Sequence, residues 1–352
     1  MITTARTDLV GLSIQELGAF AAELGLEPFR SSQISRWIFQ KHASGIGEMT
    51  NLSRELRARL GEAACISCLT PQRIDASQDG SKKYLFKTSD GFGLESVLIP
   101  EPGHITLCLS TQVGCPMGCC FCHTGSRGLV RNLTVAEILN QVRAIMAREP
   151  FGEATPNLVF MGMGEPLANY GATVAAIRML LSPEGFNFSH RRITVSTAGL
   201  VPQMKRLGHD VPVNLAISLN ASNDATRSRL MPVNKKHPLR ELLAAAREFP
   251  LASRKRITFE YILIKDINDA PLAARELAAL LNGIPCKINL IPFNEHPSVD
   301  FKKPDERSIM AFQKILHDKN FTAPIRRSKG SDIAAACGQL GDVLNHSEAD
   351  PR

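Results

Sequence analysis

Three cysteines, Cys115, Cys119 and Cys122, stand in the spacing Cys-x3-Cys-x2-Cys. Thiolate sulfur is the usual protein ligand of iron–sulfur clusters, and a 4Fe–4S cluster has four irons to ligate. Three cysteines therefore leave one iron open to a small molecule from outside the protein. A structural zinc ion would need a fourth ligand, commonly from a second, separated pair. No second Cys/His pair is well placed in the sequence, so the spacing favours a 4Fe–4S cluster.

A thioredoxin-like redox pair is the alternative, because Cys119 and Cys122 alone form a Cys-x-x-Cys motif. That interpretation leaves Cys115 without a role. Cys120 lies inside the motif but does not fit the spacing, and we interpret it as a small residue that is not a ligand. Phe121 fits two roles equally well, packing in the core or packing against a bound nucleoside.

Cysteine count and charge narrow the class of protein. Nine cysteines, five of them between Cys108 and Cys122, indicate metal binding or catalysis rather than structural disulfides. The chain has 352 residues and a net charge of +7, which favours a polyanionic partner such as a nucleic acid. No apolar run reaches the roughly 18 residues of a membrane span. Residues 1–12 lack the apolar core of a signal peptide, so we expect a cytoplasmic protein.

From residue 105 onward, short apolar runs typical of buried strands alternate with helical patterns. The expected strands are 105–110, 158–161, 193–196, 215–219, 257–263, 288–292 and a seventh at 325–328. The expected helices begin after a capping box at 134–137 and lie near 170–181, 239–247, 270–281 and 305–318. This alternation predicts an α/β fold with a parallel sheet, either open or curled into a barrel. In such sheets the chemistry gathers at the C-terminal ends of the strands.

The rest of the chain divides into three further parts. Residues 1–70 show helical periodicity, with a capping box at Ser13–Glu16 and basic residues on the polar faces. This region fits either a solvated helical bundle or a domain that binds RNA. Residues 71–103 have strand and turn patterns and are interpreted as a β linker. The main domain is expected over 104–346, followed by a disordered tail over 347–352.

Several motifs together resemble the RlmN/Cfr family of radical S-adenosylmethionine (SAM) RNA adenine methyltransferases. Besides the cysteine motif after the first strand, they are Ser110-Thr-Gln-Val-Gly-Cys115, Arg131-Asn-Leu-Thr134, Gly162-Met-Gly-Glu-Pro166, Ser196-Thr-Ala-Gly199, Ala216-Ile-Ser-Leu-Asn220, Cys286-Lys-Ile-Asn-Leu-Ile-Pro292 and Gly330-Ser-Asp-Ile-Ala-Ala-Ala-Cys-Gly-Gln339. The stretch Glu27-Pro-Phe-Arg30, with Gln33 and Trp37, resembles the helical accessory domain of the RlmN branch. The resemblance implies a partial (βα)6 TIM-like barrel, with a small helix-hairpin-helix-like N-terminal domain that binds RNA.

The resemblance also implies a cofactor site. Cys115, Cys119 and Cys122 match the ligands of a 4Fe–4S cluster, whose open iron binds SAM and delivers the electron that cleaves it to a 5′-deoxyadenosyl radical. The positions that match family contacts to SAM are Gly164, Glu165, Ser196, Ser218, Leu219, Asn220 and Asn294. Each of them alone would also fit an ordinary turn or a capped strand end. Their gathering at the ends of successive strands favours a ligand site.

Two further cysteines match catalytic positions of the family. Cys337 corresponds to the cysteine that accepts a methyl group from a first SAM before a second SAM supplies the radical. Cys108 corresponds to the cysteine that resolves the adduct, leaving a Cys108–Cys337 disulfide that is then reduced. Glu95 matches the family's proton acceptor. Taken alone, Cys337 would fit a small buried residue and Glu95 a surface carboxylate.

The implied substrate is RNA in which the target base is exposed. The N-terminal domain and the Asn234-Lys-Lys236 motif resemble the branch that methylates adenine C2 in 23S rRNA and, in some members, in tRNA. Expected partners are these RNAs and an electron donor such as flavodoxin or ferredoxin, with no membrane and a monomeric enzyme. The alternatives are a C8-methyltransferase or other radical SAM enzyme, and a non-catalytic RNA-binding module.

Overall fold

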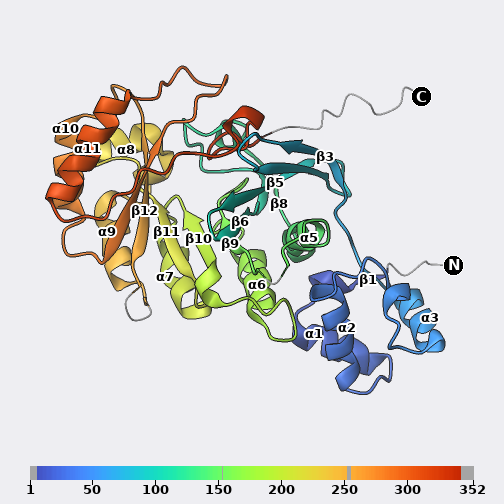
Figure 1. Cartoon of the computed structure of the whole chain (residues 1–352). Helices are drawn as coiled ribbons and strands as arrows, with labels where there is room; N and C mark the ends of the chain where they lie inside the picture. The colour runs from blue at the N-terminus through green and yellow to red at the C-terminus, as the bar shows by residue number, and fades with distance from the viewer. Residues whose placement is uncertain (1–5, 153, 252–254, 342–352) are drawn as a thin grey trace.

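The computed structural model describes residues 6–341 except 153 and 252–254, so the expected tail lies outside the described residues. Its centre is a nine-stranded sheet in the order β13-β12-β11-β10-β9-β6-β5-β4-β3 (Figure 1). The first six strands of this order are mutually parallel. They are β6 (His104–Cys108), β9 (Asn157–Phe160), β10 (Ile193–Thr197), β11 (Asn214–Ser218), β12 (Ile257–Leu263) and β13 (Cys286–Pro292).

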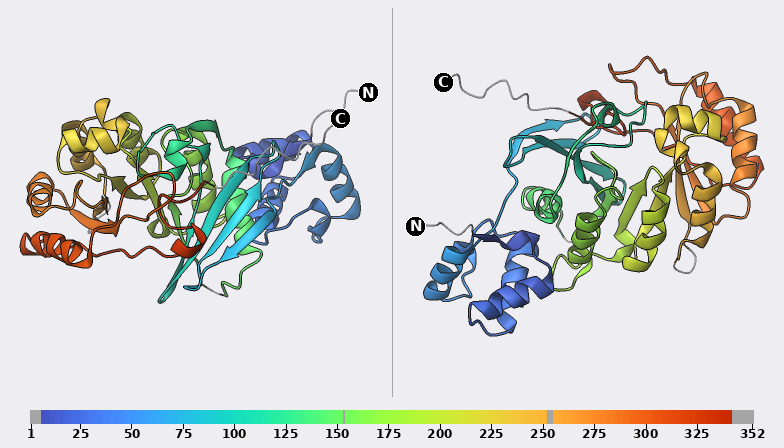
Figure 2. Two further views of the ribbon diagram at one scale, coloured as in Figure 1. Left: turned by 90° about the horizontal axis from the view of Figure 1, so that it is seen from above. Right: turned by 180° about the vertical axis from the view of Figure 1, so that it is seen from behind.

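Helices connect the parallel strands and cover the outside of the sheet (Figure 2). They are α5 (Val135–Met146), α6 (Tyr170–Leu181), α7 (Val201–Asp210), α8 (Asp224–Leu230), α9 (Leu239–Glu248), α10 (Pro271–Leu280) and α11 (Glu306–Asp318). Their apolar sides are buried against strand residues in one continuous hydrophobic core. This repeated βα pattern confirms the predicted partial (βα)6 barrel. No helix among the described residues has the length and apolar character that crossing a membrane requires.

The strands of the expected β linker continue the same sheet. β3 (Pro71–Ala76), β4 (Lys82–Lys87) and β5 (Gly93–Glu101) are antiparallel, and β5 pairs directly with β6. The register places Val97 opposite Cys108, so residues of β5 lie beside the first strand of the barrel. Segment 71–103 is therefore part of the wall that surrounds the barrel opening.

Sequence reasoning located most elements but missed those without a strong local pattern. Both capping boxes form, at Ser13–Glu16 before α1 (Ile14–Glu23) and at Thr134–Glu137 before α5. The sequence patterns did not predict α7, α8, the short α4 (His123–Ser126), or the hairpin of β7 (Gln112–Gly114) and β8 (Leu129–Asn132). The strand expected at 325–328 is reduced to one bridge between Ile325 and Leu290, because the chain then turns toward the barrel interior.

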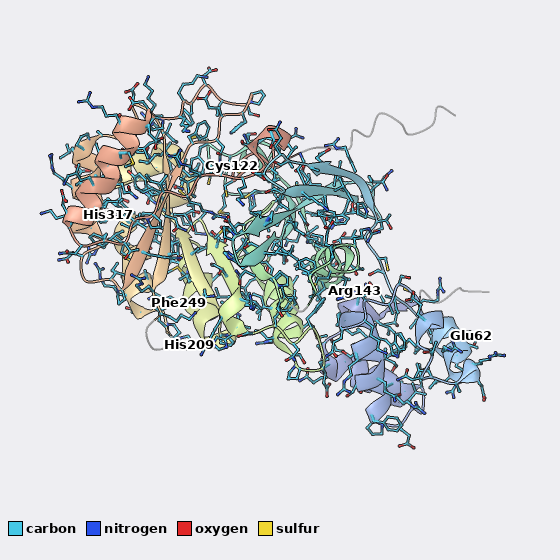
Figure 3. All side chains as sticks on the ribbon, in the orientation of Figure 1. Glu62, Cys122, Arg143, His209, Phe249 and His317 are labelled. Atoms are coloured by element: carbon cyan, nitrogen blue, oxygen red, sulfur yellow. The ribbon has the colours of Figure 1, made fainter. Side chains whose placement is uncertain are left out.

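The N-terminal helices form a separate group against α5 and α6 (Figures 1 and 3). This group contains α1, α2 (Phe29–Phe39) and α3 (Arg54–Ala63), closed by a short pairing of β1 (Thr7–Asp8) with β2 (Ala64–Cys65). The buried side chain of Arg143 on α5 joins it to the barrel. It donates hydrogen bonds to the carbonyl oxygens of Ile38 (3.0 Å), Ala43 (2.5 Å) and Ser67 (2.8 Å). One buried guanidinium therefore supplies hydrogen bonds to three carbonyl oxygens of the N-terminal segment.

Candidate functional site

The three cysteines of the motif line one cavity of about 150 Å³ at the C-terminal ends of the parallel strands. Cys115 follows β7, and Cys122 is the residue before α4. The other expected site residues that line the same cavity are Gly164, Glu165, Ser196, Ser218, Asn220 and Cys337. Residues that lie more than two hundred positions apart in sequence therefore meet in one space, which the strand-end argument predicted in outline.

Backbone hydrogen bonds fix the cysteine loop. The Cys115 N–H donates to Gly128 O (2.9 Å), which ties the loop to the end of the β7–β8 hairpin. The Cys120 N–H donates to Leu230 O (3.0 Å), which ties it to the end of α8. The Cys120 side chain packs in a small hydrophobic cluster with Met231 and is absent from the cavity lining, whereas Phe121 lines the cavity. A loop held at both ends keeps its thiols in place without a ligand.

The donor set fits a cluster better than a single ion. Burial raises the pKa of the Cys115 thiol to about 12 and that of Cys119 well above its ordinary value, and the neighbouring thiols raise the pKa of Cys119 further. Thiols so placed become ligands only beside a strong positive charge, which iron supplies. In residues 6–341, apart from 153 and 252–254, no three His, Cys, Asp or Glu side chains surround the position of a single metal ion. Three sulfur atoms around a shared cavity suit a 4Fe–4S cluster, which is larger than a single metal ion.

Glu165 is buried in the turn after β9. Its Oε1 accepts a hydrogen bond from Leu167 N–H (3.0 Å) and its Oε2 from Ala198 N–H (2.7 Å). Burial raises the pKa of Glu165 to about 7, against the effect of these backbone hydrogen bonds. The carboxylate lines the cavity, as a SAM-ammonium contact requires, and it also joins the β9 turn to the end of β10.

Gly164 is needed for contact within the protein. Its φ is +98°, and a Cβ at this position would lie 2.6 Å from Gln112 Cβ. A glycine can also admit a ligand close to the backbone, which would suit the SAM contact that the family resemblance implies for Gly164. The structure adds a different reason, namely that the turn packs against the segment after β6.

The strand-end residues differ in how their side chains are used. Ser196 and Ser218 face the cavity. The Asn220 side chain lines the cavity, but its Oδ1 already accepts a hydrogen bond from Ile262 N–H (2.8 Å). The Leu219 side chain is fully buried in the main core and is absent from the cavity lining, and its backbone N–H already donates to Glu260 O (3.0 Å).

Sequence reasoning missed Arg227, a fully buried arginine on α8. Its guanidinium donates to the carbonyl oxygens of Leu219 (3.1 Å), Ala198 (2.7 Å) and Ser218 (3.1 Å), and to Asn234 Oδ1 (2.9 Å). Burial lowers the pKa of Arg227 to about 10, and the nearby Cys119 raises it. One charged side chain therefore ties together the ends of β10 and β11 beside the cysteine loop. An arginine in a helical pattern gives no local signal of such a role.

The segment that carries Cys337 is attached to the cysteine loop. The Gly338 carbonyl accepts a hydrogen bond from His123 N–H (2.8 Å), and the Leu340 carbonyl accepts one from Thr124 Oγ1 (2.6 Å). Asn294, expected to contact SAM, lies outside the cavity lining and donates from Nδ2 to Cys337 O (3.0 Å). These contacts place Cys337 at the cavity from the far end of the chain.

Cys108 and Cys337 both line a second, adjoining cavity of about 80 Å³. Burial raises the pKa of Cys108 to about 12, and the neighbouring Cys337 raises it further. All nine cysteines are free thiols, so the expected Cys108–Cys337 disulfide is not formed in this structure. The two thiols are near enough for the charge of one to affect the pKa of the other.

Glu95 is fully buried on β5, so the surface alternative does not apply. Its Oε1 lies 3.2 Å from Lys83 Nζ, and its Oε2 accepts a hydrogen bond from Gly341 N–H (2.6 Å). It is absent from the linings of both cavities that contain Cys337. Its contacts connect the β linker to the end of the Cys337 segment.

Comparisons with known proteins agree with this geometry. A family model described as "Ribosomal RNA large subunit methyltransferase N-terminal domain" matches residues 7–66, which correspond to the helical group. A second model, described as "Radical SAM superfamily", matches residues 109–278, which contain the cysteine loop and most of the barrel.

Relatives match nearly the whole chain. It is 51% identical over 345 residues to a "Dual-specificity RNA methyltransferase RlmN" of Geotalea uraniireducens, covering 98% of this chain and 99% of that protein. It is 53% identical to the protein of the same name from Geobacter sulfurreducens, covering 96% and 93%. A crystal structure of a radical SAM methyltransferase from Sphaerobacter thermophilus matches with 44% identity and a TM-score of 0.90, covering 95% of this chain and 99% of that one.

Proposed function

Because this chain belongs to the RlmN family and is a SAM-dependent radical methyltransferase, we propose that it methylates C2 of adenine in 23S rRNA and in tRNA. The observation that carries the proposal is the single cavity that unites the three motif cysteines with Cys337. Most chemistry at a 4Fe–4S cluster has no need of a further thiol at that position. The proposed reaction does need it, because Cys337 would carry the carbon that is transferred to the base.

The enzyme uses a 4Fe–4S cluster and SAM, as members of its superfamily do. We propose that Cys115, Cys119 and Cys122 hold the cluster and that the strand ends around Glu165, Ser196 and Ser218 hold SAM. When bound, these groups supply an electron and an organic radical that removes hydrogen from a methyl group. The remaining steps fall to side chains of this chain.

Cys337 is proposed to receive the methyl group as a thiolate nucleophile, forming a C–S bond as the methyl–sulfonium bond of SAM breaks. It then carries this carbon to the adenine ring, whose C–H is not acidic enough for an ordinary base. Cys108 is proposed to release the product by attacking the Cys337 sulfur, so that an S–S bond forms as the bond from this sulfur to the transferred carbon breaks, and the disulfide is then reduced by an external donor. Their shared cavity supports this pairing.

Glu95 is proposed as the proton acceptor, and its link to Gly341 at the end of the Cys337 segment supports a role near this cysteine. We further propose that the enzyme acts as a monomer in the cytoplasm, where its RNA substrates are found. A small electron-transfer protein such as flavodoxin or ferredoxin would supply the electrons.

The test is nucleoside mass spectrometry of 23S rRNA and tRNA from a knockout strain complemented with wild type, Cys337→Ala or Cys286→Ala. Cys286 is a matched control, because it is a buried cysteine on β13 that is absent from both cavities. We expect 2-methyladenosine with wild type and Cys286→Ala and none with Cys337→Ala. Appearance of 8-methyladenosine would move the protein to the C8 branch, and no methylated adenine in any strain would refute the assignment.

A further inference from the structure

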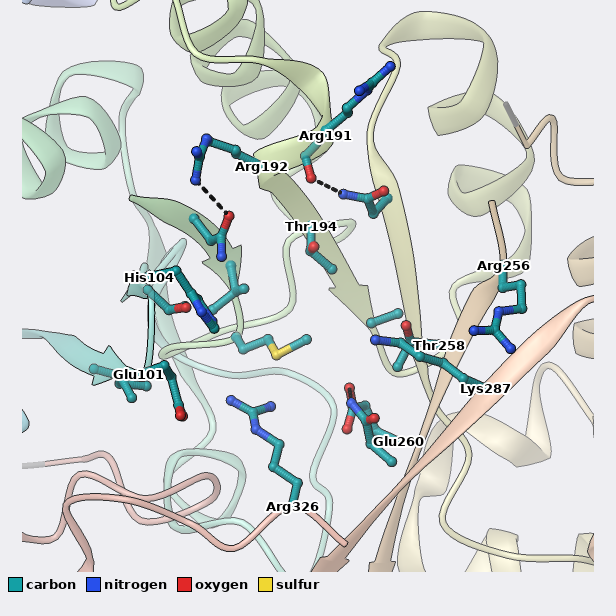
Figure 4. Close-up of a pocket in the computed structure, with 18 of the residues that line it drawn as sticks. Glu101, His104, Arg191, Arg192, Thr194, Arg256, Thr258, Glu260, Lys287 and Arg326 are labelled. Atoms are coloured by element: carbon teal, nitrogen blue, oxygen red, sulfur yellow. Dashed lines mark hydrogen bonds between the residues drawn. The ribbon is translucent and has the colours of Figure 1, made fainter. Parts of the chain in front are cut away.

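The barrel is open at the end opposite the cysteine loop. A cavity of about 500 Å³ lies there, among the first residues of the parallel strands (Figure 4). Five cations surround it, in the residues just before or at the start of β10, β12 and β13; we call them the basic mouth: Arg191, Arg192, Lys255, Arg256 and Lys287. In most barrels this end contributes to stability, and side chains fill the interior. Here it is hollow, and cations outnumber carboxylates, since Arg326 adds a sixth cation against Glu101 and Glu260.

Three of these cations donate hydrogen bonds to neutral acceptors, and the charge of Lys287 acts on Glu260, where it opposes the rise in pKa that burial causes. Arg192 donates to Asn157 Oδ1 (3.4 Å), Lys255 to Asn214 Oδ1 (3.1 Å) and Arg256 to Thr322 Oγ1 (3.1 Å), all of them neutral acceptors. Among the residues that the structure describes, no ion pair involves any member of the basic mouth. An excess of cations over carboxylates around one opening attracts a polyanion.

The interior of the barrel at this end is polar as well. Thr106, Thr194, Thr258 and Asn289 point inward from four different strands at positions that Val, Ile or Leu usually occupy. Hydroxyl and amide groups keep such a space hydrated and give hydrogen bonds to a polar ligand. A polar lining of this kind suits the entry of a polar group, whereas hydrophobic side chains would fill and close the interior.

The opening adjoins the catalytic cavity, with three side chains between the two spaces. Met161, Glu260 and Arg326 line both the cavity at the basic mouth and the cavity that contains Cys337. Figure 4 shows Glu260 and Arg326 extending toward the same central space. Glu260 is 6% exposed, its Oε1 accepts from Asn289 Nδ2 (2.9 Å), and its Oε2 has no hydrogen-bond partner. A buried acceptor without a partner marks a place for a donor group of a ligand.

We propose that the basic mouth binds the phosphates that flank the target adenosine, and that the base passes between Glu260 and Arg326 to Cys337. This inference rests on the proposed function, because it takes RNA as the substrate. The exocyclic amine of adenine is the kind of donor that Glu260 Oε2 lacks. The phosphates stay outside on cations at the rim, which is the usual division between backbone and base contacts.

An acidic electron-transfer protein is the other polyanion that such a surface could attract. The motif cysteines lie at the C-terminal strand ends, whereas the basic mouth lies at the N-terminal strand ends. A donor docked at the basic mouth would face the wrong end of the barrel for electron transfer. The position therefore favours RNA.

The first test measures the affinity of the full-length enzyme for a fluorescein-labelled RNA hairpin with one loop adenosine, by anisotropy across about 50–200 mM salt. Arg191→Gln combined with Arg256→Gln changes two exposed side chains, so the fold is expected to be kept. We expect Kd to rise roughly tenfold at low salt, and the slope of log K against log salt to become shallower by about 2. Arg275→Gln combined with Lys319→Gln is the matched control, because both are exposed cations on the outer helical layer, at α10 and just after α11.

A second measurement uses the unmodified enzyme and so does not depend on any variant. The lysines are acetylated with and without the RNA hairpin, or with flavodoxin, and the modified sites are read by mass spectrometry. RNA is expected to protect Lys255 and Lys287 several-fold, but not the exposed Lys319.

The outcomes separate the two proposals. If the Arg191/Arg256 variant keeps the wild-type Kd and salt slope, and RNA leaves Lys255 and Lys287 unprotected, the basic mouth is not the RNA site, although methylation by wild type still supports the proposed function. Protection of these lysines by flavodoxin alone would likewise overturn the inference. If wild type neither binds nor methylates the hairpin, 23S rRNA or tRNA, the proposed function itself fails.

Discussion

Arg227 donates a hydrogen bond from Nη2 to the carbonyl oxygen of Ala198 at 2.7 Å, while Glu165 accepts one from the N–H of the same Ala198 at 2.7 Å. Two buried charged side chains of opposite sign thus hold both polar groups of one residue at the end of β10. The backbone that follows Ser196, a proposed SAM contact, cannot shift without breaking one of these hydrogen bonds. This pairing positions the strand end before any ligand arrives.

Arg227→Met is expected to destabilise the protein by about 2–4 kcal/mol, because it leaves three buried carbonyl oxygens without donors. Arg229→Met is the control, since Arg229 is an exposed arginine on the same helix. The free energy of unfolding from denaturant titration measures the difference. Equal stabilities of the two variants would contradict the role given to Arg227.

Gly164→Ala is expected to destabilise the protein by about 1–3 kcal/mol and to weaken SAM binding, because the new Cβ would collide with Gln112 at a φ of +98°. Gly171→Ala on α6 meets no atom within 4 Å and should be neutral or stabilising. Thermal unfolding and calorimetric titration with SAM compare the two. A stable Gly164→Ala variant with unchanged SAM affinity would refute the packing argument.

Glu95 and Lys83 are both nearly inaccessible and lie 3.2 Å apart, so their energies should be strongly coupled. Glu95→Leu alone leaves the buried Lys83 ammonium with Asp75 as a more distant carboxylate, at 3.8 Å, and is expected to cost about 3 kcal/mol. The double variant Glu95→Leu with Lys83→Met should cost less than the sum of the single variants by at least about 2 kcal/mol. Denaturant titrations of wild type, the two single variants and the double variant give the four free energies of unfolding. Additive costs would show that the pair is not coupled.

Asn294→Ala removes the hydrogen bond to the Cys337 carbonyl and is expected to slow methylation of Cys337 roughly fivefold to tenfold, with SAM affinity unchanged. Intact-protein mass spectrometry in a single-turnover reaction follows this step. Asn282→Ala, at an exposed asparagine after α10, is the control. A weaker SAM affinity at an unchanged maximal rate would instead support the direct SAM contact expected from sequence.

Local patterns in the sequence predicted the elements well. The strand at 257–263 has the predicted bounds, because β-branched and aromatic residues dominate the segment Ile257–Leu263. The helix at 170–181 also has the predicted bounds. The cysteine spacing indicated a cluster site within one short loop. Such signals depend on residues within a few positions of one another, and sequence carries them directly.

The use of individual side chains was harder to predict. Glu165 and Asn220 were expected to serve a ligand, and both also hold backbone N–H groups of neighbouring strands. Arg227 gave no signal at all. The hydrogen-bond partner of a polar side chain depends on which strand ends become neighbours, and this is decided by the order of the sheet.

By itself the sequence determined the alternation of strands and helices, the caps of two helices and the three-thiol loop, because each is a short-range pattern. Only the tertiary structure decided what meets over long separations. Arg143 reaches the Ile38 carbonyl across 105 positions, and Glu95 reaches Gly341 across 246. The basic mouth likewise gathers cations from three separate strand starts. Parallel strands align all their N-terminal ends at one opening and all their C-terminal ends at the other, so distant residues share a site only once the sheet is formed.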